Sequence, residues 1–376
     1  MQIKKLLAGV MVLLPFTKGF SSPQEDKIGV GFNLYVDNAD VEVYSPTFSL
    51  LKKITEKLII SLKTRIDAIS AASIRNGGRP NQVDAVTGAS YKEGFDDVRY
   101  AGSLSITYDT VNYSVTLGGY YSTEIDYEGR AIFANVIKQF NNQNTALGFG
   151  FSQSFDRWYP VFDRELPKEY RRERKLDISF TQLLSPTAMI QFIYTNLYSE
   201  GFLASPYHYV INNEIAKFEK YPDTRNANAF TVKLVKLITE PMSINLYYRY
   251  YLDDWDIKSH TINTEVLRDI KEDFTLGVRY RYYTQTKANF IKPVDQYTQS
   301  DKYFAIDYRM SSFSSNTIGI SFIYKPSGQF FIDWDRVKLE GSIDYYFTSS
   351  NEYIKRWYEE DRLHAVFTSF MTTYTF

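Results

Sequence analysis

Few side chains in this sequence are arranged for chemistry, and each arrangement has a structural alternative. The clearest is segment 84–90, which reads Asp-Ala-Val-Thr-Gly-Ala-Ser. The Ser90 hydroxyl could act as a nucleophile, because Gly88 and Ala89 leave little bulk beside it. The same residues are also ordinary turn material, and Asp84 could cap the turn.

A near copy of this segment lies just upstream, at residues 67–73, where the sequence reads Asp-Ala-Ile-Ser-Ala-Ala-Ser. It differs most clearly at Ala71, which stands in the place of Gly88. Two copies are compatible with two reactive sites, with one site and a decayed twin that ends in Ser73, or with a structural repeat that packs the two segments together.

The overall composition excludes several classes of function. The chain of 376 residues has no cysteine, so disulfides, iron–sulfur clusters and cysteine-bound zinc are excluded. The three histidines, His208, His260 and His364, are not spaced like metal ligands, and we assign no metal site. A net charge of -1 gives no support for nucleic-acid binding. No Ser-His-Asp arrangement stands out, so we assign no catalytic residue and do not expect an enzyme.

The aromatic content points to a membrane. The sequence contains 32 Tyr and 27 Phe, and tyrosine suits a membrane barrel because its ring sits in the apolar zone while its hydroxyl reaches headgroups or water. A mean hydropathy of -0.33 agrees with this, since only every second residue of a spanning strand faces lipid.

The two ends of the chain predict export and assembly. Residues 1–21 read as a signal peptide, with Lys4 and Lys5 before a short apolar run and small residues before a cleavage site that we place after Ser21. The chain ends in Phe376, which shares one face with Tyr374 and Phe370. This ending resembles the signal that the bacterial barrel-insertion machinery reads, and we expect that machinery as a partner.

The interior alternates in polarity over stretches of about ten residues, as the strands of a barrel do. Examples are 103–108, 114–125, 244–251 and 274–283. Short turns near 141–144, 185–186 and 240–242 alternate with longer loops near 71–96, 155–172, 200–225, 288–302 and 349–361. We therefore predict an all-β fold, a transmembrane antiparallel up-and-down barrel of about sixteen strands over residues 22–376. The alternative is a soluble β-sandwich, which should not need aromatics at nearly every strand end.

The alternation also predicts which polar side chains face the lumen. Arg249, Arg279 and Arg281 should face it, together with Glu124 and Asp126. Because neither sign dominates, the sequence predicts no ion selectivity; such a lumen could be a polar channel or a salt-bridged plug.

One further acidic group could bind a cation or a substrate. Asp253 and Asp254 precede Trp255, and His260 follows. We favour a structural role, in which Trp255 anchors the membrane interface and the acids solvate a strand end. By parity His260 falls on the face of Ile262, away from the lumen.

Several motifs resemble a family of bacterial outer-membrane barrels that is known only as a domain of unknown function. They are YYRYYLDDWDIKSHT at 247–261, VRYRYYTQTKAN at 278–289, Gln-Leu-Leu-Ser at 182–185 and the Ser-Pro-Tyr loop at 205–207. The Asp-Asp-Trp and Ser-His-Thr pair within the first motif is the most specific part. The resemblance implies the barrel fold and a Gram-negative outer membrane, with lipid and lipopolysaccharide as surroundings.

Members of that family are often encoded near a periplasmic flavin transferase, which suggests a second role for segment 84–90. The segment is similar to the site at which such enzymes attach FMN through a phosphoester, with Ser90 as acceptor and Asp84, Thr87, Gly88 and Ala89 around it. The resemblance therefore implies covalent FMN on Ser90, with the flavin transferase and periplasmic redox proteins as partners.

Three functions follow as hypotheses. The barrel could carry FMN and support electron transfer across the outer membrane. It could be a passive porin for small solutes. It could also be a scaffold whose long loops bind other surface or periplasmic proteins.

Overall fold

The computed structural model describes residues 25–39, 41–71, 95–158, 167–205, 208–330, 332–356 and 360–376. Sixteen long strands form the wall of the molecule: β1 (Lys27–Asp37), β2 (Val41–Lys53), β3 (Leu58–Ala71), β4 (Phe95–Asp109), β5 (Tyr113–Thr123), β6 (Tyr127–Phe140), β7 (Thr145–Trp158), β8 (Glu169–Ser185), β9 (Ala188–Gly201), β12 (Thr224–Thr239), β13 (Met242–Asp253), β14 (Lys258–Asp269), β15 (Phe274–Gln285), β16 (Phe313–Tyr324), β19 (Val337–Thr348) and β20 (His364–Thr375).

Shorter elements lie in the connections. They are the strands β10 (Tyr209–Ile211), β11 (Ala216–Phe218), β17 (Gln329–Phe330) and β18 (Ile332–Asp333), and the 3-10 helices η1 (Val294–Gln296), η2 (Tyr308–Met310), η3 (Trp334–Arg336) and η4 (Ile354–Arg356). Within the described residues, no helix is long and apolar enough to cross a membrane.

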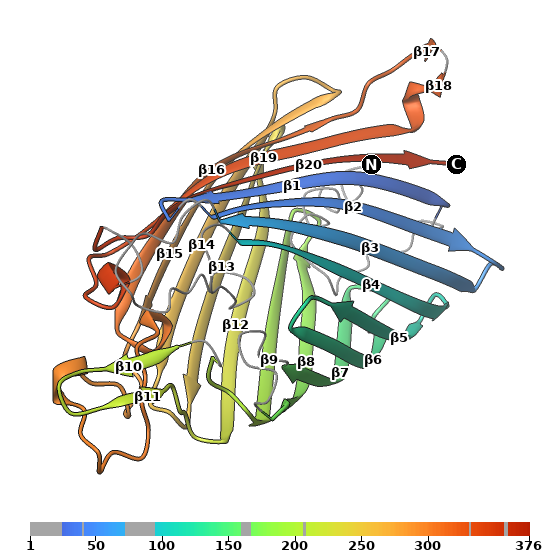
Figure 1. Ribbon diagram of the computed structural model, residues 1–376. Coiled ribbons are helices and arrows are strands. Elements are labelled where there is room, and N and C mark those ends of the chain that lie inside the picture. The colour runs from blue at the N-terminus through green and yellow to red at the C-terminus, as the bar shows by residue number, and fades with distance from the viewer. Residues whose placement is uncertain are drawn as a thin grey trace.

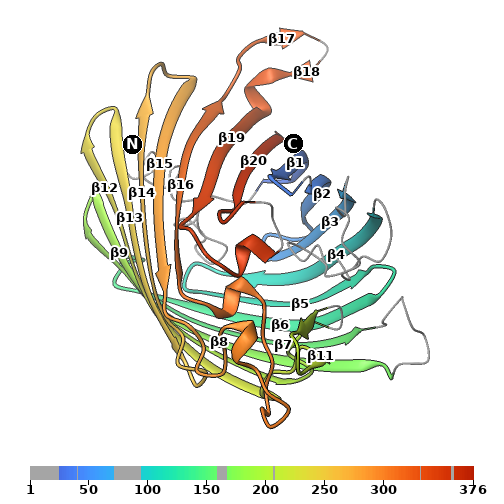
Figure 2. The same ribbon diagram turned by 60° about the vertical axis from the view of Figure 1, so that its left-hand side comes forward.

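The sixteen strands form one closed barrel in which each strand pairs with the next long strand along the chain (Figures 1 and 2). All of the pairs are antiparallel, and β20 closes the barrel against β1 with a register that runs from Lys27 opposite Thr375 to Asp37 opposite Ala365. Closure leaves no unpaired edge, which is the condition for a sheet to span a bilayer. The predicted up-and-down barrel of about sixteen strands is confirmed.

The alternating sequence places apolar side chains on the outer face of the wall, because successive residues of a strand point to opposite sides. Leu104, Leu117 and Ile132, on β4, β5 and β6, are 54%, 61% and 59% exposed. Such apolar exposure would be unfavourable in water but suits contact with acyl chains. The barrel is therefore a transmembrane protein of the bacterial outer membrane.

The two ends of the barrel differ. The C-terminus and most of the short turns lie at one end, which the short-turn rule makes the periplasmic one. The connections 202–223, 286–312 and 349–363 lie at the other, extracellular end. One connection departs from the predicted pattern: residues 325–336 form a long turn at the periplasmic end, and the small hairpin of β17 and β18 projects there from the barrel (Figure 1).

Several strands are longer than a membrane requires. Strand β8 has 17 residues, whereas about 9–11 residues of a tilted strand cross a bilayer. At its extracellular end Arg172 pairs with Glu200 of β9 on the outer face, with 3.7 Å between their charged atoms. This pair would be costly among acyl chains, so the upper parts of β8 and β9 stand above the membrane.

Candidate functional site

Among the described residues, two cavities inside the barrel, of about 790 and 640 Å³, share part of their lining. The larger one is lined by strands β9, β12–β16, β19 and β20, and the other lies toward the extracellular end, under residues of the 202–223 and 286–312 connections. The residues common to both are Thr261, Arg281, Tyr283, Gln285 and Arg309. The lumen is therefore hollow over two adjoining stretches, and the part of the wall that both cavities share is polar and aromatic.

One ion pair inside the barrel spans a whole strand. Arg279 of β15 reaches over Gly319 of β16 and donates two hydrogen bonds to Asp344 of β19. A Cβ atom on residue 319 would lie 1.9 Å from an Asp344 carboxylate oxygen, so only glycine leaves the pair its space. Glu265 stands next to Arg279 on β14 and accepts a hydrogen bond of 3.1 Å from Asn245.

Other inward arginines near the extracellular mouth are also neutralised by carboxylates from neighbouring positions. Each of these pairs has an N–O distance of 2.6 or 2.7 Å: Arg99 with Asp67, Arg171 with Asp156, Arg225 with Asp253, and Arg309 with Asp307. Because the carboxylates of Asp156, Asp253 and Asp307 are almost fully buried, removal of the arginine that pairs with any one of them would leave an uncompensated charge, at a cost of about 3–5 kcal/mol. Asp67 has a second partner in Arg65, at 2.9 Å.

On strands β12, β13 and β15, three inward cations lack this compensation. Among the described residues, Lys233, Arg249 and Arg281 form no ion pair with a carboxylate. Arg249 lies 5.8 Å from the ring centre of Tyr251, and Lys233 lies 5.8 Å from that of Tyr247. The predicted inward direction of Arg249, Arg279 and Arg281 is confirmed. Of these three arginines, Arg279 pairs with a carboxylate, whereas Arg249 and Arg281 do not.

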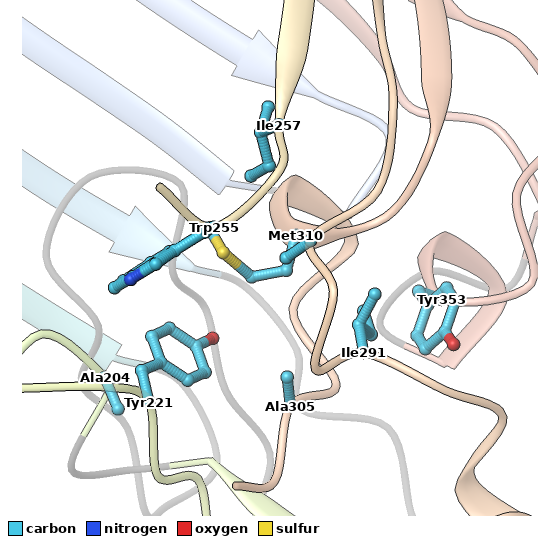
Figure 3. Close-up of a cluster of buried hydrophobic side chains, with 9 residues drawn as sticks. Ala204, Tyr221, Trp255, Ile257, Ile291, Ala305, Met310 and Tyr353 are labelled. Atoms are coloured by element: carbon cyan, nitrogen blue, oxygen red, sulfur yellow. The ribbon is translucent and has the colours of Figure 1, made fainter. Parts of the chain in front are cut away.

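The extracellular connections pack into a layer with an apolar core of its own. We call it the loop layer and define it as residues 202–205, 208–223, 254–257, 286–312 and 349–356. Its main cluster contains Ala204, Tyr221, Trp255, Ile257, Ala288, Ile291, Ala305, Met310 and Tyr353 (Figure 3). Trp255 is 3% exposed, and its ring meets those of Tyr221 and Phe290 edge to face at 5.7 and 5.2 Å. Burial of these side chains orders loops that are far apart in the sequence.

A buried carboxylate ties the two longest connections of the loop layer together. One oxygen of Glu219 accepts hydrogen bonds from the backbone N–H groups of Ile306 and Asp307, at 2.6 and 3.0 Å. The other accepts one of 3.0 Å from the Tyr221 hydroxyl and lies 2.7 Å from Nδ1 of His208. Burial raises the pKa of the Tyr221 hydroxyl well above its usual value, so this group stays a donor.

The sequence relatives agree with this architecture. The family model described as "Protein of unknown function (DUF3570)" matches residues 14–174 and 162–359, which together make up most of the chain. The chain belongs to the DUF3570 family. None of the curated proteins matches it. The signature of Asp253–Trp255 with Ser259–Thr261, and the nearby flavin transferase gene, stay predictions.

Solved structures resemble this DUF3570 barrel in fold. A bacterial polysaccharide outer membrane secretin superposes with a TM-score of 0.54 at 6% identity, over 95% of this chain and 100% of that chain. The outer membrane protein OpdK from Pseudomonas aeruginosa gives a TM-score of 0.45 at 9% identity, over 94% of this chain and 98% of that one. At such identities the likeness extends to the fold alone.

The acidic group around Trp255 has a structural role, but a different one from that expected, because the Asp253 carboxylate is buried and does not solvate the strand end. One oxygen of Asp253 accepts from the backbone N–H groups of Trp255 and Ile257, at 3.0 and 2.9 Å, and the other accepts from Arg225. His260 lies on the outer face, where its Nδ1 is 2.9 Å from the Tyr248 hydroxyl. The expectation that Trp255 anchors the membrane interface is wrong, because its ring lies in the core of the loop layer and its Nε1 donates to Thr224.

Three carboxylates at the mouth could hold a metal ion. Asp97, Glu124 and Asp126 place ligand oxygens within 4.8 Å of one another, and the Arg99 guanidinium lies 3.7 Å from Glu124. Burial, aided by the neighbouring acids and opposed by Arg99, raises the pKa of Glu124 to about 8. A shared proton and the Arg99 guanidinium thus account for the close approach of the three carboxylates without a metal ion. Glu124 lines the lumen, as predicted.

The predicted flavin segment, with Asp84, Thr87, Gly88, Ala89 and Ser90, lies outside the described residues, as do the signal peptide and Ser73. The flanking residues Ala71 and Phe95 are at the extracellular end of β3 and β4. In the upstream copy, Asp67 is a buried member of β3 that accepts a 2.5 Å hydrogen bond from Ser45 and pairs with Arg99. Its first residue therefore belongs to the barrel wall.

Proposed function

We propose that this DUF3570 barrel is a passive channel for small polar solutes across the outer membrane. The observation that supports the proposal is the pair of adjoining cavities inside the wall, which meet at Arg281 and Tyr283. Polar and aromatic side chains there can replace part of the hydration of a passing solute, whereas an apolar filling would have plugged the barrel.

The loop layer fits the same function. It lies over the mouth, and Ala204, Tyr221 and Met310 belong both to its apolar core and to the lining of the smaller cavity. A layer that packs on itself would restrict the entrance to a fixed size, as expected for a channel that admits small solutes only. We also propose membrane lipid and lipopolysaccharide as the partners of the outer face, and the barrel-insertion machinery as the partner of the terminal strand.

Liposome swelling tests the channel. Purified protein reconstituted in liposomes should admit arabinose faster than protein-free liposomes do, and should admit the tetrasaccharide stachyose much more slowly than arabinose. Arabinose entry at the rate of protein-free liposomes would overturn the channel and favour the scaffold hypothesis, in which the loop layer binds other proteins and nothing passes.

A second candidate function is electron transfer through covalent FMN on Ser90, which rests on the sequence of segment 84–90 alone. Since the flanking strands end on the extracellular side, a periplasmic transferase would have to act before insertion, or the segment would have to fold into the lumen. Intact mass of protein purified from its native membrane decides this candidate. One added FMN that is lost in Ser90→Ala would support it, and an unmodified mass from cells with an active transferase would refute it.

A further inference from the structure

We infer that the lumen carries a binding site for small organic anions, in particular carboxylates with an aromatic body, on the wall formed by β12, β13, β14 and β15. The inference rests on the proposed channel and names its solute class. It starts from three inward cations of this wall, Lys233, Arg249 and Arg281, that form no ion pair with a carboxylate among the described residues.

The strand register explains why these three cations are left unpaired. Arg249 lies between Thr231 and Thr261 on the neighbouring strands, and Arg281 lies between Asn263 and Thr317. Every one of these neighbours is neutral. An arginine in such surroundings keeps free N–H donors in a planar fork that matches a carboxylate.

Lys233 has the same kind of environment. Its neighbours across the register are Gln191 on β9 and Tyr247 on β13, which are neutral as well. The three cations lie on adjacent parts of one wall, because Tyr247 is two residues from Arg249 and Thr261 lies opposite Tyr283. Anions entering this stretch would therefore meet several positive groups in succession.

The carboxylates of this wall do not cancel the excess. Glu265 and Asp344 both flank Arg279, and Asp344 is held by its two hydrogen bonds. Together with Arg279, the three unpaired cations give four positive charges against these two negative ones. Walls of low dielectric constant strengthen the attraction of such an excess for an anion.

The tyrosines of the wall point to the body of the anion. Tyr247, Tyr283 and Tyr346 line the larger cavity, and Tyr251 and Tyr283 line the smaller one. Their rings can stack on a flat apolar group while an arginine holds its carboxylate. The larger cavity, of about 790 Å³, has room for a small aromatic acid with water around it.

Benzoate is the probe, and neutral benzamide is its matched control. Equilibrium dialysis at pH 7 should show that the detergent-solubilised barrel binds benzoate in preference to benzamide. Binding should weaken at least about tenfold in Arg281→Gln, because this variant removes a charged hydrogen-bond partner from the lining of both cavities. The control variant Arg268→Gln changes an exposed arginine on the outer side of β14 and should bind like the wild type.

Reversal potentials in a KCl gradient provide the second measurement. The wild-type channel should prefer chloride over potassium, and Arg281→Gln should move the preference toward unity. Binding of benzoate without any conductance would overturn the channel and support the anion site. A conducting channel with no chloride preference, or with benzoate binding equal to that of benzamide or unaffected by Arg281→Gln, would overturn the anion site and leave the channel intact.

Discussion

Replacement of Trp255 by alanine should release the loop layer while the barrel stays folded. The ring fills the centre of the apolar cluster, meets Tyr221 and Phe290 edge to face, and lies 4.5 Å from the Arg225 guanidinium. Its Nε1 also satisfies the Thr224 carbonyl oxygen at 2.9 Å. The variant Trp255→Ala loses all of these contacts in one step, without changing any residue of the strands.

The size of the effect follows from these contacts. Truncation of a buried tryptophan to alanine costs about 3–5 kcal/mol, and each edge-to-face pair adds about 0.5–1.5 kcal/mol beyond burial. Since about 1.4 kcal/mol is tenfold in an equilibrium constant, the open population of the loop layer should rise by at least about a hundredfold. The sixteen-stranded wall has its own hydrogen-bond ladder and should not respond.

Limited proteolysis measures that population directly. Trypsin should cleave Trp255→Ala after Lys217 and Lys287, in the loop layer, much faster than the wild type, because cleavage tracks the open fraction. The heat-dependent shift of the barrel in gel electrophoresis should be unchanged. The control Trp334→Ala changes a tryptophan at the periplasmic end. Equal cleavage rates in Trp255→Ala and the wild type would refute the idea that this cluster orders the layer.

Two further predictions concern buried charges. Gly319→Ala should lower the thermal midpoint of the barrel by an amount equivalent to about 1–3 kcal/mol, because the new Cβ atom would displace Asp344 from Arg279. The control variant Gly102→Ala, whose Cβ atom would meet nothing nearer than 3.7 Å, should leave the midpoint unchanged. Equal midpoints for the two variants would contradict this prediction. For Glu124, the pKa is raised from 4.5 to about 8 by burial, so the stability that it contributes is fully present below pH 4.5 and is lost as the pH rises through 8. As the pH rises from 4.5 to 8.5, the stability of Glu124→Gln relative to the wild type, measured from thermal midpoints, should therefore increase by at most about 5 kcal/mol. A difference between the two proteins that does not change with pH would contradict the raised pKa of Glu124.

The wall of the barrel could be predicted because the alternation of polar and apolar residues can be read within each strand alone. A strand that separates lipid from water must alternate, so Leu104, Ile106 and Tyr108 fall on one face whatever the rest of the chain does. The same parity correctly placed His260 outside, and Arg249 and Arg281 inside.

The loop layer could not be predicted in this way. Trp255, Ile291 and Tyr353 come from three separate connections and follow no period, so nothing in the sequence shows that they meet. A tryptophan after a strand end is also typical of a membrane-interface anchor, which is why the sequence predicted that role. The 325–336 turn was missed for a similar reason, since its short hairpin carries no alternating run.

The balance of charge inside the lumen depends on register, which composition does not reveal. The mixed signs of the residues expected to face the lumen predicted no ion selectivity. In the structure, Arg279 faces a carboxylate across Gly319, while Arg281, two residues later, faces only neutral side chains. A shift of the register would exchange these environments, so the unpaired cations could be identified only from the paired strands.

A pair of cysteine variants tests the channel most directly, because the chain has no cysteine of its own. Tyr283 lines both cavities, and its neighbour Tyr282 points to the outer face of the same strand. In planar bilayers, a bulky thiol-reactive methanethiosulfonate should lower the single-channel conductance of Tyr283→Cys and leave that of Tyr282→Cys unchanged. Equal responses of the two variants, or no channels in either, would contradict a solute path through the lumen.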